Sequence, residues 1–396
     1  MATFRLNLNK LLILNKLAFM TKRLLSLIFY LFSFSAIAQL NNEAFNNIRP
    51  INPLRVHELY LDFDVLLFTR NNEYFNHIAD GYTLYGFQFA PFISYYPSGK
   101  VRIDAGIYLQ KDFGNDNFNQ ILPILTVKFD LGPFQQLFGN LEGSLNHQYI
   151  EPLYDFERVL IDRQETGMQT KFVNETTFFD LWVFWETMIY KKDPNLEEVS
   201  GGISFFKDKW IGNHRFRIPL QFIAYHKGGQ IDFNPSKILT LWNSAAGLSY
   251  SYFFQNGWIK SVHADGYFVY YENITPSHRL AFDDGEGWFT NISINTKIDL
   301  EFMASYWKGD EFMTIKGGQL YPSLSSAVHH EGLVEPTREL LILRIMHNLK
   351  LTDDIMWSAR FEPVYSIQNK RWDYSWGFYL NYYPDFFLSK IKTNKH

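Results

Sequence analysis

Charged side chains stand at alternate positions within otherwise apolar segments, and their types and spacing limit the chemistry the chain could do. A row that mixes both signs can orient polar solutes through a transverse electric field. The same row can instead neutralise itself in buried salt bridges. Both interpretations stay open. The residues concerned are Arg102, Asp104, Lys128, Asp130, Asp180, Glu186, Arg215, Arg217, Arg344, Arg360 and Glu362.

Hydrolysis would need a serine, a histidine and a carboxylate or amide brought together by neighbouring strands. Ser244 beside Asn243, with His226 on the preceding strand, is the best trio, although alternation does not put all three clearly on one face. Paired carboxylates could also catalyse hydrolysis, but we expect the carboxylates of this chain to have mainly structural roles. The candidates are Asp180, Glu186 and Glu142. We assign no catalytic residue and no metal ligand, and we expect no cofactor.

The elements that would position these residues are β-strands, because apolar positions recur with a period of two. Near the C-terminus, Trp372 and Tyr374 fall on one side and Asp373 on the other. A long candidate from Trp288 to Trp307 is expected to turn near Thr296. The alternating segments are Leu59–Leu67, Val101–Leu109, Leu125–Leu131, Leu141–Gln148, Phe216–Ala224, Ile355–Tyr365 and Trp372–Tyr382.

Alternation alone does not separate a membrane barrel from a soluble β-sandwich, whose strands also have one apolar face. The apolar faces run five or six positions, which is the length a tilted strand needs to cross a bilayer core of about 30 Å. Aromatic residues recur near the ends of these faces, where interfacial girdles lie in barrels. They are Tyr85, Tyr95, Trp288, Tyr306, Trp357, Tyr365, Trp372 and Tyr382. The pattern therefore favours a membrane barrel.

Composition excludes several classes of protein. The 396 residues contain no cysteine and have a net charge of -4, which excludes disulfides and thiolate sites and gives no indication of nucleic-acid binding. After residue 40 no apolar run is long enough for a transmembrane helix. Residues 20–39 have the basic, apolar and small-residue regions of a secretory signal peptide. We expect translation to start at Met20 and cleavage after Ala38, so residues 1–38 are excluded from the fold.

The signal peptide, the lack of cysteine, the alternating strands and the aromatic final strand resemble bacterial outer-membrane β-barrel proteins of porin-like type. The resemblance is one of pattern over the whole mature chain. The strands predict an all-β fold, a single antiparallel transmembrane β-barrel of roughly 14–16 strands with long extracellular loops and short periplasmic turns. This barrel would span residues 39–396. A basic tail, residues 384–396, departs from the usual pattern and leaves open whether Tyr383 or Phe387 closes the barrel.

The resemblance implies the outer membrane of a Gram-negative bacterium, with outer-membrane lipid, lipopolysaccharide and the barrel assembly machinery as partners. The first functional hypothesis is passive diffusion of small polar solutes through a constricted lumen lined by the charged residues above, without enzyme activity. A second is a non-conducting structural barrel with partner proteins in a secretion, assembly or export complex. A third is a barrel-embedded lipid hydrolase or protease.

Two long segments bear on this choice. Gln148–Gly167 has enough apolar residues to fold inward and constrict the pore, to dock a partner, or to cap the barrel. Lys316–Pro336 is long enough to form a lid or plug.

Overall fold

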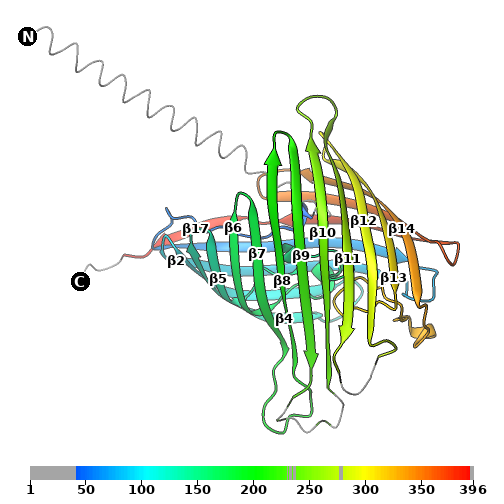
Figure 1. Ribbon diagram of the computed structural model, residues 1–396. Coiled ribbons are helices and arrows are strands. Elements are labelled where there is room, and N and C mark those ends of the chain that lie inside the picture. Colours follow the sequence, from blue (N-terminus) through cyan, green and yellow to red (C-terminus); the bar gives the residue numbers. More distant parts are fainter. Residues whose placement is uncertain (1–41, 230, 232–233, 235–237, 276–279, 393–396) are drawn as a thin grey trace, which may run out of the picture. The chain divides into compact units, whose positions relative to one another are not determined.

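The computed structural model describes residues 42–229, 231, 234, 238–275 and 280–392 (Figure 1). Residues 38–396 form one compact unit. The expected signal peptide and the last four residues of the basic tail lie outside the described residues. Within the described part of the chain, none of the helices combines the length and the apolar content that crossing a bilayer would require.

The described residues form 17 strands and a few short helical segments. The strands are β1 (Glu58–Glu73), β2 (Thr83–Ser98), β3 (Val101–Asp112), β4 (Gln120–Leu131), β5 (Phe134–Asn140), β6 (Thr166–Asn174), β7 (Thr177–Thr187), β8 (Glu198–Ile211), β9 (His214–Lys227), β10 (Leu239–Phe253), β11 (Ile259–Asn273), β12 (Asp284–Thr296), β13 (Leu300–Asp310), β14 (Thr337–Lys350), β15 (Ile355–Ser366), β16 (Arg371–Tyr382) and β17 (Asp385–Lys390). The helical segments are η1 (Glu43–Phe45), η2 (Ser144–His147), α2 (Arg158–Ile161) and η3 (Val328–His330).

The sheet closes on itself. Each strand from β1 to β16 pairs antiparallel with the next one in sequence, and β16 pairs back with β1. The result is a closed barrel of 16 strands, whose neighbouring strands can be followed in Figure 1. The prediction of a single all-β antiparallel barrel is confirmed. The expected turn inside Trp288–Trp307 is also present, because β12 ends at Thr296 and β13 begins at Leu300.

Two strands in succession close the barrel against β1. Residues 65–73 of β1 pair with β16, and residues 58–62 pair with β17. Tyr383 and Pro384 separate these strands, since proline has no N–H for the ladder, although Phe63 N still donates to Pro384 O at 3.1 Å. The sequence left open whether Tyr383 or Phe387 closes the barrel, and β17, which contains Phe387, continues the wall beyond β16.

The connections differ in length at the two ends of the barrel. At one end, where β1 begins, the strands are joined by turns such as residues 99–100, 132–133 and 175–176. At the other end the connections include residues 74–82, 141–165 and 311–336. Outer-membrane barrels have short periplasmic turns and longer extracellular loops, so we expect the long-loop end to face outward from the cell.

The wall has an exposed apolar outer face and a buried polar inner face. In β9, for example, Phe216, Ile218 and Leu220 are exposed while Arg215 and Arg217 are buried. This arrangement satisfies the hydrogen-bonding groups inside the barrel and leaves hydrocarbon-compatible side chains outside. None of the eight predicted girdle aromatics is buried, and Tyr85, Trp288 and Trp372 are among the exposed ones.

One predicted strand is wrong. Leu141–Gln148 alternates in polarity but forms no strand, because the chain leaves β5 at Asn140 and turns into the lumen through η2. Gln148 then adopts a left-handed conformation (φ 60°) that ends η2. Alternation over so few residues does not distinguish a strand from a buried irregular segment.

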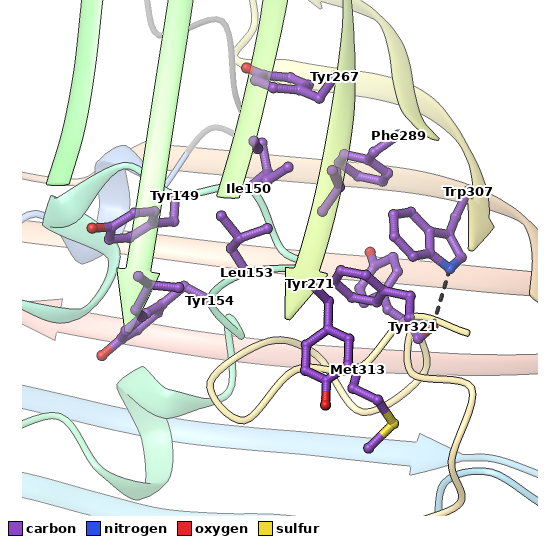
Figure 2. Packing of buried hydrophobic residues seen from close by; sticks show 14 of the residues in the cluster. Tyr149, Ile150, Leu153, Tyr154, Tyr267, Tyr271, Phe289, Trp307, Met313 and Tyr321 are labelled. Carbon is purple, nitrogen blue, oxygen red and sulfur yellow. Dashed lines mark hydrogen bonds between the residues drawn. The ribbon is translucent and has the colours of Figure 1, made fainter. Parts of the chain in front are cut away.

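The main apolar core lies inside the barrel. Tyr149, Ile150 and Leu153 from residues 141–165 pack in one cluster with wall residues such as Tyr267 and Phe289 (Figure 2). A membrane barrel wall exposes its apolar outer face to lipid, so a lumenal core of this kind must come from segments that enter the barrel. The two segments that do so define the candidate site.

Candidate functional site

The first inner loop, residues 141–165 between β5 and β6, crosses the lumen. Ile150, Leu153 and Leu160 have exposed fractions of 3% or less. The loop also meets wall strands on all sides of the barrel, so it is a plug rather than a cap. Its wall partners include Arg70 on β1, Gln88 on β2, Gln110 on β3, Asp180 on β7, Gln221 on β9, Arg344 on β14 and Tyr379 on β16.

The second inner loop, residues 311–336 between β13 and β14, packs against the first. Asp155 N donates to Lys316 O at 2.7 Å, and Gly318 N donates to Glu151 O at 2.9 Å. Close approach depends on glycine at one point, because a Cβ on Gly317 would lie 2.0 Å from Pro152 O. Gln148–Gly167 thus follows the inward path, one of its three expected arrangements, and Lys316–Pro336 packs against it inside the barrel.

The second loop is also fixed to the wall. Trp307 Nε1 on β13 donates to Tyr321 O at 3.2 Å, which Figure 2 marks with a dashed line. Lys316 Nζ lies 2.5 Å from Glu186 on β7. The two loops therefore pack together as one unit across the long-loop half of the lumen.

His147 fastens the first inner loop to the wall between two carboxylates. Its Nδ1 lies 2.7 Å from Asp180 Oδ2, and its Nε2 lies 2.7 Å from Glu165 Oε2. The ring stacks on Trp182 at 4.4 Å between centroids, and all four side chains are buried. Burial alone would lower the pKa of His147, but Glu165 and Asp180 raise it to about 9. His147 is consequently a cation that donates from both nitrogens and is unsuited to act as a base.

Glu165 responds in the opposite sense. Burial would raise the pKa of its carboxyl, but His147, together with donors from Tyr154 and Ser144 N, lowers it to about 2. Ser144 N donates to Glu165 Oε1 at 3.0 Å. The pair is therefore ionised across the physiological range.

A second polar cluster lies nearer the long-loop end, around Glu157. Its Oε1 accepts from Arg70 Nε at 2.8 Å and from Asn72 Nδ2 at 2.7 Å. Tyr82 donates to Oε2, and Gln319 Nε2 of the second inner loop donates to the Tyr82 hydroxyl at 2.6 Å. The cluster thus joins β1, the β1–β2 loop and both inner loops.

Asp155 lies beside this cluster, where the two inner loops meet. Its Oδ1 accepts from Glu157 N at 3.1 Å, and the residue is half-buried. Burial and the charge of Glu157 raise the pKa of Asp155 to about 7, while Arg70 acts in the lowering direction. A carboxyl that titrates near neutral pH in a partly accessible position is a candidate general base.

A serine–histidine contact lies at the short-turn end of the inner wall. His263 Nδ1 on β11 lies 2.7 Å from Ser251 Oγ on β10, and its Nε2 lies 3.0 Å from Ser261 Oγ. Arg215 Nη2 donates to Ser251 Oγ at 3.0 Å. His263 has an exposed fraction of 6% and Ser251 of 0%, so this contact is closed to a bulky substrate.

The predicted charged residues lie on the inner wall, where most are buried and hydrogen-bonded or ion-paired. The pairs are Arg102–Asp104, Lys128–Glu142, Asp180–His147, Glu186–Lys316, Arg217–Asp208, Arg344–Glu151 and Glu362–Arg70. Arg215 donates to Ser251, Arg360 donates to Asn42, and Asp130 is only partly buried and accepts from Gly132 N.

The structure separates the predicted hydrolytic trio. Asn243 faces inward, is 1% exposed and donates to Met313 O at 2.7 Å, whereas Ser244 occupies the opposite face. His226 is in register with Thr240, whereas Ser244 is in register with Phe222. Four positions separate them, or about 13 Å at the rise of a strand. The carboxylates offered as a hydrolytic alternative do not pair with one another and have the structural contacts that were the main expectation. Asp180 contacts His147, Glu186 contacts Lys316, and Glu142 contacts both Lys128 and Lys171.

Several interior residues were missed from the sequence. Asp155 and Glu157 lie in a stretch of loop without periodicity, and His147 lies in Leu141–Gln148, whose alternation wrongly predicted a strand. The partners Arg70 of Glu157 and Asp180 of His147 come from distant strands. The Ser261–His263 contact at the short-turn end could have been recognised from the sequence, because the two residues stand two positions apart and so share one face of a strand.

The closed 16-strand antiparallel sheet, with its apolar outer and polar inner face, defines the class of outer-membrane β-barrel proteins. Within that class, the chain belongs to the family described as lipid A 3'-O-deacylase-type, which matches residues 51–391. No curated protein matches the sequence.

Solved structures share the fold at low sequence identity. A loop L8 deletion mutant of OmpT, an outer membrane protein of Vibrio cholerae, has a TM-score of 0.50 at 11% identity and covers 83% of this chain and 100% of its own. OprD from Pseudomonas aeruginosa has a TM-score of 0.49 at 11% identity, with coverages of 84% and 95%. OccK11 (OpdR), also from Pseudomonas aeruginosa, has a TM-score of 0.47 at 11% identity, with coverages of 86% and 100%.

Proposed function

We propose that this protein hydrolyses the ester bond of an acyl chain on a lipid A-type glycolipid, at the long-loop end of the barrel. The family description supports this substrate class, since the match covers residues 51–391. An outer-membrane barrel is also in contact with such lipids. The proposal replaces passive diffusion as the favoured activity.

The filled lumen supports this choice. Passive diffusion needs a continuous aqueous path, and the first inner loop contacts β1, β2, β3, β7, β9, β14 and β16. The core around Leu153 and Tyr271 is apolar and tightly packed. Interior packing of this density leaves little room for solutes.

The proposed chemistry rests on one observation, the position of the half-buried Asp155 carboxyl where the two inner loops meet. Burial and the charge of Glu157 raise the pKa of this half-buried carboxyl, which makes it better able to accept a proton from water and return it at the next step. The water oxygen would attack the acyl carbonyl carbon while its proton moves to Asp155. The bond to the sugar oxygen then breaks, and Asp155 returns the proton to that oxygen, leaving a free fatty acid and a hydroxyl group.

The surrounding cluster would position this base. Arg70 is held by Glu157 at 2.8 Å and by Glu362 at 3.1 Å, so its charge is fixed close to the reacting carboxyl. Because Arg70 is ion-paired with both Glu157 and Glu362 and is 4% exposed, it holds the cluster around Asp155 in place. We assign Asp155 as the base and Arg70 as a positioning residue.

The test is acyl release from purified hexa-acylated lipid A by the protein in detergent, followed by mass spectrometry. Asp155→Asn should lower the rate by at least about 100-fold, as expected for loss of a general base. Wild-type rate should rise with pH through about 7, because the deprotonated carboxylate is the active form. Asp193→Asn, on the exposed β7–β8 loop, is the matched control and should leave the rate unchanged.

Two results would overturn the assignment. No acyl release by the folded wild-type protein would reject the hydrolase. Full activity of Asp155→Asn would reject Asp155 as the base and leave the reaction to another group.

A gated channel is the second candidate, and one observation favours it. Beside the apolar core, ion pairs and hydrogen bonds also join the inner loops to the wall, including Glu157–Arg70 and Lys316–Glu186, and contacts of this kind can break and reform. In planar bilayers, the wild-type protein should be silent and a variant lacking residues 149–160 should conduct. Steady conductance of the wild type would favour the channel over the sealed barrel.

A further inference from the structure

The outer face of the barrel has an apolar depression of about 810 Å³ across β9–β14. Its floor consists of small outward-facing residues on adjacent strands, and large apolar residues stand at its edges. At one edge Leu248 is 69% exposed, and Ile292, which rises between the floor residues Ala264 and Ala304, is 64% exposed. The lining includes Ala264, Thr290 and Ala304 on the floor and Phe216, Tyr250 and Leu341 at the edges.

The pairing register shows how the floor forms. Ala264 is opposite Ile292, and Ile292 is opposite Ala304, so two alanines flank one larger side chain. In the next row Gly266 is opposite Thr290. Strands lie 4.7–4.9 Å apart, so the depression from β10 to β13 is about 14 Å wide.

Packing does not require the glycine at position 266, which lies between the lining residues Leu248 and Thr290. A Cβ on Gly266 would meet only the Thr290 methyl group at 3.4 Å, an ordinary contact, and its backbone is not left-handed. Glycine inside a strand weakens the strand and often marks the close approach of a ligand or another backbone. Here the glycine leaves open space on the lipid-facing side.

The depth of this depression in the membrane points to one occupant. The row Ala264–Ile292–Ala304 lies in the half of each strand nearer the short turns, which is the half expected to face the periplasmic leaflet, and Gly266 and Thr290 lie at mid-strand. The charged residues in the lining, Arg217 and Asp265, are 6% and 8% exposed because they point into the barrel. What reaches the depression from outside is therefore hydrocarbon.

A second copy of the barrel fits less well. A neighbouring wall would rest on the protruding Leu248 and Ile292 side chains and leave the floor empty. An empty hollow forfeits dispersion contacts with the atoms that line it. A flexible hydrocarbon chain can enter between the edges and contact the floor on several sides.

We propose that this depression is a binding site for one acyl chain of a membrane glycerophospholipid. It contains none of the residues of the Asp155 cluster, so the proposal stands apart from the proposed hydrolysis. Because it contacts the floor and both edges, this acyl chain has a longer residence time than the acyl chains around the rest of the wall.

The test uses native mass spectrometry of the full-length protein reconstituted in vesicles of dioleoylphosphatidylethanolamine and then transferred to detergent. Wild type should retain one phospholipid per barrel. The double variant Ala264→Leu/Ala304→Leu and the single variant Gly266→Leu should each lower retention about tenfold, which corresponds to about 1.4 kcal/mol. Ala105→Leu, on the outer face of β3, is the matched control and should retain the lipid.

Heat-modifiable migration in gels checks that each variant is folded. Because two different variants fill the depression, the test remains possible if one of them does not fold. Equal retention by wild type and both filling variants would overturn the proposal, as would a wild type that keeps no phospholipid. Retention of added oleic acid alone would overturn the choice of a glycerophospholipid. A wild-type dimer that the filling variants lose would assign the depression to a second copy instead.

Discussion

His147 and His263 are both buried inside the barrel, but their partners give them different roles. His147 contacts two carboxylates, and both contacts measure 2.7 Å. His263 contacts two neutral hydroxyls, from Ser251 and Ser261. The first histidine holds a loop through its charge, whereas the second contacts hydroxyl groups within the wall, one of which also accepts from Arg215.

The comparison shows that burial does not determine what a histidine does. An isolated buried charge is costly, and it persists only where opposite charges compensate it. The partners of His147 come from the loop itself and from β7, so its charge connects the first inner loop to the barrel. The partners of His263 come from β10 and β11, which the sheet already holds together.

The largest effect should follow loss of the His147 charge. In His147→Leu, Glu165 and Asp180 remain as two buried carboxylates without their shared cation, which should destabilise the loop by about 3–5 kcal/mol. Trypsin cleavage after Arg158 or Arg163 reports this loosening. His226→Leu, a half-buried histidine bonded only to Thr240 in the described contacts, is the control. Unchanged protection in His147→Leu would mean that the ion pairs do not hold the loop.

A somewhat smaller effect should follow from pH. The pKa of His147 is raised from 6.5 to about 9, so its stabilisation is complete below pH 6.5 and is lost as pH rises through about 9. The pKa of Glu165 is lowered from 4.5 to about 2, so its stabilisation is present above pH 4.5 and is lost as pH falls through about 2. Integrated over its shift, the His147 contribution is about 3 kcal/mol.

Protection of the first inner loop in hydrogen exchange should therefore fall as pH rises, first as Asp155, whose pKa is raised, becomes charged and then as the charge of His147 is lost through about pH 9. The His147→Leu variant should lack the alkaline decline. An identical pH profile in that variant would assign the dependence to other groups.

The smallest effect should follow removal of a hydroxyl beside His263. Ser251→Ala loses neutral hydrogen bonds and leaves the Arg215 donor without this acceptor, at a cost of about 1–3 kcal/mol. Urea unfolding in micelles, followed by tryptophan fluorescence, measures the change, and trypsin protection of the first inner loop should stay normal. Loss of acyl release in Ser251→Ala, with folding intact, would move the active site to this end of the barrel and contradict the assignment of Asp155.

Much of the barrel could be predicted from local pattern. The segments Phe216–Ala224 and Ile355–Tyr365 lie within β9 and β15, and their side chains alternate between the two faces as expected. The candidate site was far less predictable. Segment Gln148–Gly167 was recognised as able to fold inward, but Asp155 and Glu157 have no periodic signal that indicates their partners.

The sequence by itself determined the class of fold, because strand faces follow from a period of two and do not depend on distant residues. It also determined which charged side chains point inward. Only the tertiary structure decided which of them pair: Arg70 meets Glu157, and Arg344 meets Glu151, across 87 and 193 residues of chain. Such contacts depend on ring closure and on the path of a loop through the lumen, and neither leaves a local pattern in the sequence.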